Sequence, residues 1–512
     1  MKFWKTFTAV ALSGLLALSA TACNGGGTSW KDDNSSIVQA DDTDRSGWVP
    51  FEKATFAEGT KLRIKFFNGG YGRKWLDAMK EKFEKDYPGV EVILTPSTNE
   101  ADFTQTISTT LQTSSPDDIY ICHNIPWQRL SVNNLVMNLD NLFNSVIYTD
   151  SKKDDAPIRL VDRIASSSLN TLQFKGHFYS IPEIQGAGGI AYNKTMFDEY
   201  GWEVPTTYEE LAALCEKITS ENRKTEDGET ITPFVWSGTT AYLWDSIVYD
   251  WWVQIAGMDE FNEFMKYENK EMFNSEKFPS LKKAWTYWYD LLCKNSSYSH
   301  GQSTALDNLQ CNMAFAAGQA AMMPATCWVA NEVGKETLGE FGCDIGMIPT
   351  PYVKEAKKDS EGNVIRVAYD MAGKDSFIIA QKGKNKQVAV EFFKWMALEE
   401  NALLFPQNTN GLLLAMRYDT KNLIENVAKT TWEKDMFSLL TTANRFNLYS
   451  SSPMVINAGT PLSPYPMGNY YLEAFETYGA SEGEVTPDSV FSAVWEKIDR
   501  EWDMMRAAVG LS

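Results

Sequence analysis

The sequence predicts an α/β protein with at least two lobes, and three observations support this. The chain has 512 residues, more than a single hydrophobic core usually organises. Hydrophobic residues make up 44% of it and charged residues 22%, which is a globular composition and not a disordered one. Segments with the alternating pattern of strands are interleaved with segments that have the period of amphipathic helices. Such interleaving is typical of lobes built on mainly parallel sheets flanked by helices.

The first α/β segment is predicted from three strands and the two helices between them. Residues 61–67 alternate apolar and polar side chains, and residues 90–94 and 116–121 form the next two strands. Between the first two strands, Trp75, Leu76, Met79 and Phe83 fall on one helical face, and Pro88 and Gly89 end that helix. The second helix is expected over residues 102–112.

The same alternation resumes further along the chain. Turn residues predict hairpins at 226–229 and 359–363. The last 90 residues or so are expected to be mostly helical. Helices are predicted at 207–220, 240–256, 280–294, 386–400 and 488–507, and strands at 231–236, 343–348 and 375–380.

The N-terminus is predicted to be a lipoprotein signal peptide over residues 1–22. Lys2 and Lys5 precede an apolar stretch that is too short to be a permanent membrane span, and small residues lead to Cys23. This arrangement resembles a bacterial lipobox, which implies that Cys23 carries the lipid. An ordinary signal peptide cleaved after Ala22 is the alternative. Residues 23–57 are polar and are expected to form a flexible tether.

Charge argues against a nucleic-acid partner. The chain has 67 acidic and 47 basic residues, a formal net charge of −20, which phosphate backbones repel. The other conspicuous feature is its aromatic content of 27 Phe, 22 Tyr and 17 Trp. A bulky core would account for it, and so would a ligand site lined by flat rings.

Motifs for catalysis, metals and cofactors are missing from the sequence. His123, His177 and His300 have no metal-ligand spacing, so neither a metal site nor a cofactor is expected. No phosphate-binding P-loop or nucleophile elbow occurs. The six cysteines after Cys23 are either buried thiols or bridged, with Cys311–Cys327 the first pair to check. A catalytic carboxylate pair is not excluded, although the inventory favours binding over catalysis.

Several motifs in a fixed order resemble the bacterial extracellular solute-binding proteins of sugar ABC importers, the branch with maltose- and oligosaccharide-binding lipoproteins. Residues 176–182 match G-x-x-Y-x-x-P, and residues 190–194 contain Y-N-K. Residues 205–211 match P-x-T-[WY]-x-E-L, and residues 313–322, followed by Trp328, match F-x-x-G-x-A-A-M…W. The likeness extends over residues 60–420.

This resemblance implies a two-lobed periplasmic-binding-protein fold of type II with a ligand cleft between the lobes. The implied first lobe comprises residues 58–184 and 369–414, and the second comprises 185–368 and 415–512. The chain would cross between lobes near 182–188, 365–370 and 412–417. Gly186, Gly188 and Gly189 suit a hinge because glycine tolerates unusual dihedral angles, although a bulge or loop is equally consistent with them.

A sugar ring has an apolar face for aromatic side chains and hydroxyls for polar groups. Trp328 is the favoured stacking residue, whereas Trp127 and Trp236 are either ligand contacts or core. Trp285 and Trp288 recur at helical spacing, which favours core packing. The candidate ligand-binding residues are Trp328, Trp236, Trp127, Asn124, Glu183, Gln185, Asp370, Tyr369, Asp375, Asn68, Tyr71 and Arg73.

The resemblance implies a monomeric, extracytoplasmic receptor that is not an enzyme. It would bind a carbohydrate, in particular an oligosaccharide, and pass it to the permease subunits of an ABC importer. Its contact with the membrane would be the lipid anchor alone. Two alternatives stay open: a secreted carbohydrate-active hydrolase or lyase, and a receptor for a non-sugar solute such as a peptide or polyamine.

Overall fold

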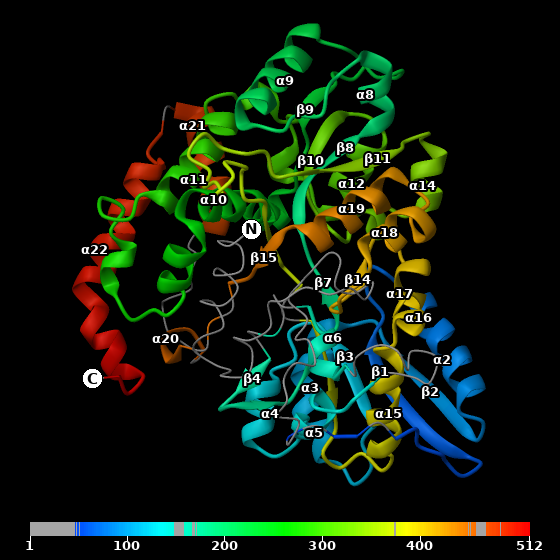
Figure 1. The fold of residues 1–512 in the computed structure, drawn as a ribbon. Coiled ribbons are helices and arrows are strands. Elements are labelled where there is room, and N and C mark those ends of the chain that lie inside the picture. Colours follow the sequence, from blue (N-terminus) through cyan, green and yellow to red (C-terminus); the bar gives the residue numbers. More distant parts are fainter. Residues whose placement is uncertain are drawn as a thin grey trace. The chain divides into compact units, whose positions relative to one another are not determined.

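The protein is described from a computed structural model (Figure 1). The structure describes residues 47–511 except for 48, 51, 148–157, 166–168, 170–171, 373–374, 449, 451, 457–466 and 482. The predicted signal peptide, Cys23 and most of the predicted tether lie outside the described residues. Over the described residues, the helices include none whose length and apolar character would let it cross a membrane.

The chain divides into two compact units, each made of two stretches of sequence. Unit 1 contains the chain up to Gly186 together with Ala372–Thr442, and unit 2 contains Ala187–Met371 and Ala443–Ser512. The first two crossings lie within three residues of the expected boundaries. The third does not, because residues 415–442 belong to unit 1 and not to the second lobe.

Unit 1 is built on a mixed five-stranded sheet in the order β2-β1-β3-β13-β6. Its strands are β1 (Thr60–Phe67), β2 (Val90–Ser97), β3 (Ile119–Cys122), β4 (Gln173–Phe174), β5 (His177–Phe178), β6 (Ile181–Pro182), β7 (Ile184–Gln185), β13 (Ser376–Ile379) and β14 (Leu413–Leu414). Its helices are α2 (Lys74–Asp86), α3 (Glu100–Gln112), α4 (Trp127–Val132), α5 (Asp140–Phe143), α6 (Leu160–Arg163), α15 (Lys386–Met396), α16 (Glu399–Ala402), α17 (Leu404–Gln407), α18 (Thr420–Asn422), the π-helix η7 (Leu423–Val427) and α19 (Thr431–Thr442).

Helix α2 buries the four residues that its sequence periodicity predicts, Trp75, Leu76, Met79 and Phe83. Phe83 packs against Phe392 and Trp395 of α15, with ring centroids 5.2 Å apart in both pairs. The two helices therefore pack together within unit 1 and extend the core beyond the sheet (Figure 1).

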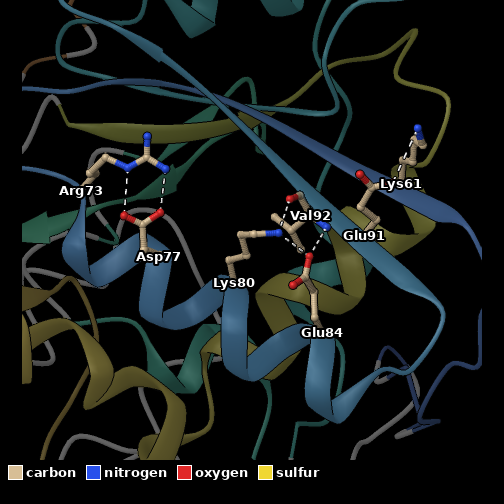
Figure 2. Close-up of polar contacts among 7 residues, drawn as sticks. All are labelled: Lys61, Arg73, Asp77, Lys80, Glu84, Glu91 and Val92. Carbon is tan, nitrogen blue, oxygen red and sulfur yellow. Dashed lines mark hydrogen bonds and ion pairs between the residues drawn. The ribbon is translucent and has the colours of Figure 1, made fainter.

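Helix α2 also protects the edge strand β2 (Figure 2). Glu84 accepts a hydrogen bond from the Val92 backbone N–H at 2.7 Å, and Lys80 donates one to the Val92 carbonyl oxygen at 2.7 Å. Lys80 and Glu84 pair with each other at 2.5 Å. These side chains satisfy strand groups that a neighbouring strand would otherwise use, which removes a template for unwanted pairing.

Unit 2 is built on a four-stranded sheet in the order β11-β8-β10-β9. Its strands are β8 (Gly188–Asn193), β9 (Thr232–Phe234), β10 (Ala320–Thr326), β11 (Ile345–Pro349), β12 (Val367–Tyr369) and β15 (Asn444–Phe446). Its helices are α8 (Lys194–Tyr200), α9 (Tyr208–Glu221), η2 (Gly238–Trp244), α10 (Asp245–Phe264), η3 (Lys270–Phe273), α11 (Ser280–Trp288), η4 (Tyr289–Cys293), η5 (Ser296–Tyr298), η6 (Ser303–Ala305), α12 (Asn308–Ala316), α13 (Val329–Val333), α14 (Lys335–Glu340), α20 (Pro453–Ile456), α21 (Met467–Ser481) and α22 (Pro487–Ala508).

The expectation of mainly parallel sheets was wrong. In unit 1, β1 runs parallel to β2 and β3, but β13 runs antiparallel to β3 and β6. In unit 2 only β9 and β10 are parallel, and β8 is antiparallel to both of its neighbours. Strands β8 and β13 begin just after the chain has crossed between units. No helical βαβ connection within the unit fixes their direction.

Gly188 and Gly189 lie in β8 for reasons of space and not of unusual dihedral angles. Neither residue, nor Gly186, has a positive φ. A Cβ on Gly188 would lie 2.1 Å from Cβ of Ser246, and one on Gly189 would lie 2.4 Å from the Ile348 carbonyl oxygen. The proposed dihedral basis for a glycine hinge is therefore replaced by close packing around β8.

The six described cysteines are all buried thiols outside disulfides, so Cys311 and Cys327 do not form a bridge. This resolves the alternative that the spacing left open in favour of buried thiols.

Candidate functional site

Three neighbouring strands of unit 1 end in a row of titratable side chains. His123 follows β3, Asp375 precedes β13, and Glu183 follows β6. Ser376 pairs with both Cys122 and Pro182, so the next positions along the three strands lie side by side. The Glu183 backbone N–H donates to the Asp375 carbonyl oxygen at 2.9 Å, which continues the pairing into the row.

Short hydrogen bonds connect this row. The Tyr71 hydroxyl donates to Oε1 of Glu183 at 2.5 Å, and Nδ1 of His123 lies 2.5 Å from Oδ1 of Asp375. Glu183 is 1% exposed and Asp375 is 5% exposed. The Phe67 ring packs edge-on against the His123 imidazole, with centroids 5.4 Å apart. We call Tyr71, Glu183, Asp375 and His123 the acid row.

Burial and neighbouring charges shift the pKa values in the acid row. Burial, reinforced by the charge of Asp375, raises the pKa of Glu183 to about 8, although Tyr71 and His123 act in the opposite direction. Burial favours neutral His123, but the charge and hydrogen bond of Asp375 outweigh it and raise the His123 pKa to about 9. Burial, followed by the charges of Glu183 and Asp375, raises the pKa of Tyr71 well above its usual value.

Asn68, which follows β1, contributes an open acceptor to this end of the sheet. Its side-chain oxygen is buried, and no hydrogen bond reaches it from the residues that the structure describes. A buried amide oxygen without a partner is costly, so a ligand hydroxyl at this position would be stabilised. The acid row and Asn68 together offer donors and acceptors of the kind that sugar hydroxyls pair with.

The other candidates in unit 1 have structural partners. Arg73 makes two hydrogen bonds to Asp77, at 2.9 and 2.6 Å (Figure 2). Exposed Asn124 adopts a φ of 53° and donates to Glu100 at 3.2 Å.

Gln185 and Trp127 are likewise held by their surroundings. Gln185 is 2% exposed, and its amide donates to the carbonyl oxygens of Met416 and, at 2.8 Å, Leu414. This fixes β7 to β14. Trp127 is 7% exposed and belongs to a core cluster that includes Phe103. In this structure these two side chains serve packing and crossover geometry.

In unit 2, Trp328 lies just after the central strand β10 and is partly exposed. Its carbonyl oxygen accepts hydrogen bonds from the backbone N–H groups of Asn331 and Glu332, at 2.9 and 3.0 Å, which start α13. The strand end and the short helix therefore fix the position of its backbone. The stacking role expected of Trp328 from the sequence stays a prediction.

Tyr369 and Asp370 lie together at the end of β12. The Tyr369 ring packs edge-on against Tyr249 at 5.0 Å, and Asp370 pairs with Arg445 at 3.2 Å. Arg445 comes from β15, which pairs with β12 and begins one residue after the third crossing. The ion pair therefore joins two crossover segments within unit 2.

Trp236 is packed as a core residue. It is 1% exposed, its indole N–H donates to the Ser299 hydroxyl at 3.1 Å, and Phe475 of α21 packs edge-on against it at 5.1 Å. Of the two roles left open for Trp236, ligand contact or core, this packing fits the core. The sequence had not shown that a C-terminal helix would cover the end of β9.

Two residues of these clusters were not among the predicted site residues. His123 has no metal-ligand spacing and was not predicted to contact a ligand, although it directly precedes the candidate Asn124. Its place at the end of a predicted strand was the available signal. Arg445 has no comparable signal, because its strand is short and pairs with one 77 residues earlier. Among the described residues, no group of three His, Cys, Asp or Glu side chains could hold a metal ion.

Comparisons with known proteins agree with the two-unit architecture. RafE from Streptococcus pneumoniae, solved in its apo form, superposes with a TM-score of 0.59 over 86% of this chain and all of its own, at 18% identity. That likeness shows the shared fold.

Two sequence relatives match long stretches of this chain at low sequence identity. The diacetylchitobiose binding protein NgcE of Streptomyces coelicolor is 22% identical over 438 residues, which are 85% of this chain and 81% of the relative. An uncharacterized ABC transporter extracellular-binding protein of Pyrococcus horikoshii is 24% identical over 292 residues, 56% of this chain. The match spans only 59% of that relative's length.

The family assignment rests on a profile match and not on any single relative. The profile described as bacterial extracellular solute-binding protein matches residues 69–403, more than half of the 512 residues. Its description concerns the binding of solutes outside the cell, not catalysis. The chain therefore belongs to the family of bacterial extracellular solute-binding proteins.

Proposed function

We propose that this protein binds a carbohydrate outside the cytoplasm and delivers it to the permease of an ABC importer. The observation that carries the proposal is the end of the unit 1 sheet, where a hydroxyl, two carboxyl groups and an imidazole lie with a buried amide oxygen that has no hydrogen-bond partner among the described residues. Such dense donors and acceptors suit the adjacent hydroxyls of a sugar. The Streptomyces coelicolor relative is named for binding diacetylchitobiose, which supports this ligand class.

In this proposal, Tyr71, Glu183, Asp375 and Asn68 contact sugar hydroxyls from unit 1. From unit 2, Trp328 stacks on a sugar face, with Tyr369 and Asp370 as further contacts. Ligand binding selects and stabilises a closed arrangement of the protein.

Cys23 carries a lipid that anchors a monomeric receptor to the membrane. Replacing Cys23 with Ala should release the protein from the membrane fraction and abolish incorporation of labelled palmitate.

Thermal-shift measurements with a panel of glycans test the carbohydrate proposal. A bound ligand raises stability by RT ln(1 + [L]/Kd), so a ligand at about 100 times its Kd adds about 2.7 kcal/mol. We expect at least one uncharged oligosaccharide to raise the melting temperature, and Trp328→Ala to reduce that shift strongly.

Phe341→Ala is the matched control for Trp328→Ala. Phe341 is an aromatic residue of the same unit and is 46% exposed, so its removal should leave the ligand-induced shift unchanged. Equal shifts in wild type and Trp328→Ala would exclude Trp328 as a ligand contact. If no carbohydrate raised the melting temperature at millimolar concentration, the ligand would be a non-sugar solute.

The neighbouring carboxyl groups of Glu183 and Asp375 give the hydrolase alternative a specific test. Glycosidases use two carboxyl groups, one of them with a raised pKa. Incubating the protein with the glycan that raises its melting temperature should yield stoichiometric binding and no new product by chromatography. Turnover that is lost in Glu183→Gln would instead identify an enzyme.

A further inference from the structure

The acid row brings two carboxyl groups together at low exposure, so their protonation is linked. Glu183 faces Asp375 from β13, Tyr71 from the loop after β1, and His123 and Cys122 from β3. Glu100 of α3 adds a further negative charge that acts on His123 and Cys122. Two carboxylates side by side with little water resist being ionised together.

We infer that Tyr71, Glu183, Asp375 and His123 form one proton-sharing network, and that this network couples binding of an uncharged saccharide to protonation of the protein. The inference rests on the proposed function, because it assigns a regulation to the same site. The geometry supports it through the two hydrogen bonds of 2.5 Å and the backbone bond that places Glu183 beside Asp375.

The charge state of the row follows from its neighbours. At neutral pH, Glu183 holds its proton because its pKa is about 8, and His123 is cationic because its pKa is about 9. The His123 cation then lies against the Asp375 carboxyl group, and the protonated Glu183 carboxyl group is a donor that also accepts the Tyr71 hydroxyl. Above pH 8, loss of the Glu183 proton adds a negative charge to the row.

A saccharide bound against the row would exclude water from its partly exposed members, Tyr71 and His123, and would favour the uncharged form of Glu183 further. The pKa of Glu183 would therefore be higher in the complex than in the free protein. Affinity would be at its full value below pH 8 and would fall by up to about tenfold per pH unit above it. Binding above pH 8 would take up a proton from the solvent. An anionic sugar would meet increasing repulsion over the same range.

The network can be tested without a ligand by following the imidazole signals of the free protein by NMR. The sequence has only three histidines, so each can be assigned by substitution. We expect His123 to titrate near pH 9, and its transition to move down in both Asp375→Asn and Glu183→Gln. The control is Asp140→Asn, which removes the 2.6 Å partner of His177 and should leave the His123 transition in place. The proposed network would be overturned if the His123 transition lay near pH 6.5 in wild type. It would also be overturned if Glu183→Gln left that transition unchanged.

The coupling is tested by measuring affinities for N,N′-diacetylchitobiose and raffinose between pH 6 and 9.5. Wild type should lose affinity with rising pH from about pH 8, whereas Glu183→Gln should show a flat profile over that range. Parallel profiles in the two proteins would overturn the coupling. If neither sugar bound at any pH, the coupling proposed for these two sugars would be wrong, and the glycan panel would decide separately whether the protein binds another carbohydrate. The histidine titration would still decide whether the network exists.

Discussion

Glu183 lies at a position where an ionised carboxyl group lowers the stability of the folded protein. Its carboxyl group is 1% exposed beside Asp375, and burial together with that neighbour raises its pKa to about 8. A buried carboxyl group next to another carboxylate is unfavourable once both are ionised. Retaining such a group at a strand end, where an apolar residue would pack without cost, is typical of a functional position.

Because of this buried carboxyl group, the free energy of unfolding should depend on pH. Glu183 binds a proton up to about pH 8 in the folded state but only up to about pH 4.5 when unfolded, so the folded state binds more protons in between. Its contribution is fully present below pH 4.5 and is lost as the pH rises to 8. His123 acts in the same sense between about pH 6.5 and 9. We therefore expect Glu183→Gln to flatten the decline in unfolding free energy between pH 5 and 8.

Denaturant unfolding at several pH values measures this effect, which should be on the order of a few kcal/mol for so buried a group. Glu81→Gln, an exposed change on α2, serves as the control and should keep the wild-type pH profile. If Glu183→Gln and wild type lost stability in parallel from pH 5 to 8, Glu183 would already be ionised in the folded protein.

At the scale of elements, sequence patterns predicted the helices and strands that depend on contacts between nearby residues. The α2 face, the β1 strand and the long C-terminal helix follow from periodicity and from turn residues, because those features act over a few neighbouring positions. Strand direction could not be predicted in the same way. β13 pairs with β3 and β6 from distant parts of the chain, and only tertiary packing sets its orientation.

The contact between α2 and β2 gives a prediction for one element. Glu84→Ala removes the acceptor for the Val92 N–H and the partner of Lys80. The edge strand β2 therefore loses the side chain that satisfies its outward-facing N–H group. Losing a hydrogen bond to a charged group typically costs about 1.5–3 kcal/mol. We expect unfolding free energy to fall by roughly that amount, at the lower end because Glu84 is partly exposed.

Glu81→Ala is the matched control, since it makes the same change on an exposed position of the same helix. It should alter the unfolding free energy by less than about 0.5 kcal/mol. Equal stability of the two variants would mean that the Val92 groups are satisfied equally well by water.

At the scale of the whole molecule, the candidate site was predicted only in part. The resemblance to solute-binding proteins pointed to Tyr71, Glu183 and Asp375, and the structure brings these residues together at one end of the sheet. Trp236 had the same signal and is nevertheless covered by Phe475, a contact across more than 200 residues that no local pattern encodes. The third crossing was misplaced for the same reason, since α19 joins unit 1 through tertiary packing and not through any sequence marker.

The C-terminal helices α21 and α22, red in Figure 1, complete the core of unit 2 although they lie beyond the family match. Tyr471 packs on Trp288 at 4.6 Å, Phe491 packs on Trp285 at 5.7 Å, and Phe475 covers Trp236. A chain that ends before Met467 would expose these three fully buried indoles to water. Burying one large aromatic side chain contributes on the order of 2–3 kcal/mol, so the loss at three indoles would be comparable to the whole unfolding free energy of a typical domain, about 5–15 kcal/mol.

We therefore expect the truncated chain to lose the folded unit 2 while unit 1 keeps its own core. Near-ultraviolet circular dichroism should lose most of its tryptophan signal, because most tryptophans of the chain lie in unit 2. Phe475→Ala in the full-length chain is the milder companion variant. It should lower the melting temperature without abolishing the signal, because only the cover of Trp236 is removed. A truncated protein with the near-ultraviolet spectrum and melting temperature of the full chain would show that α21 and α22 are appended to unit 2 and are not part of its core.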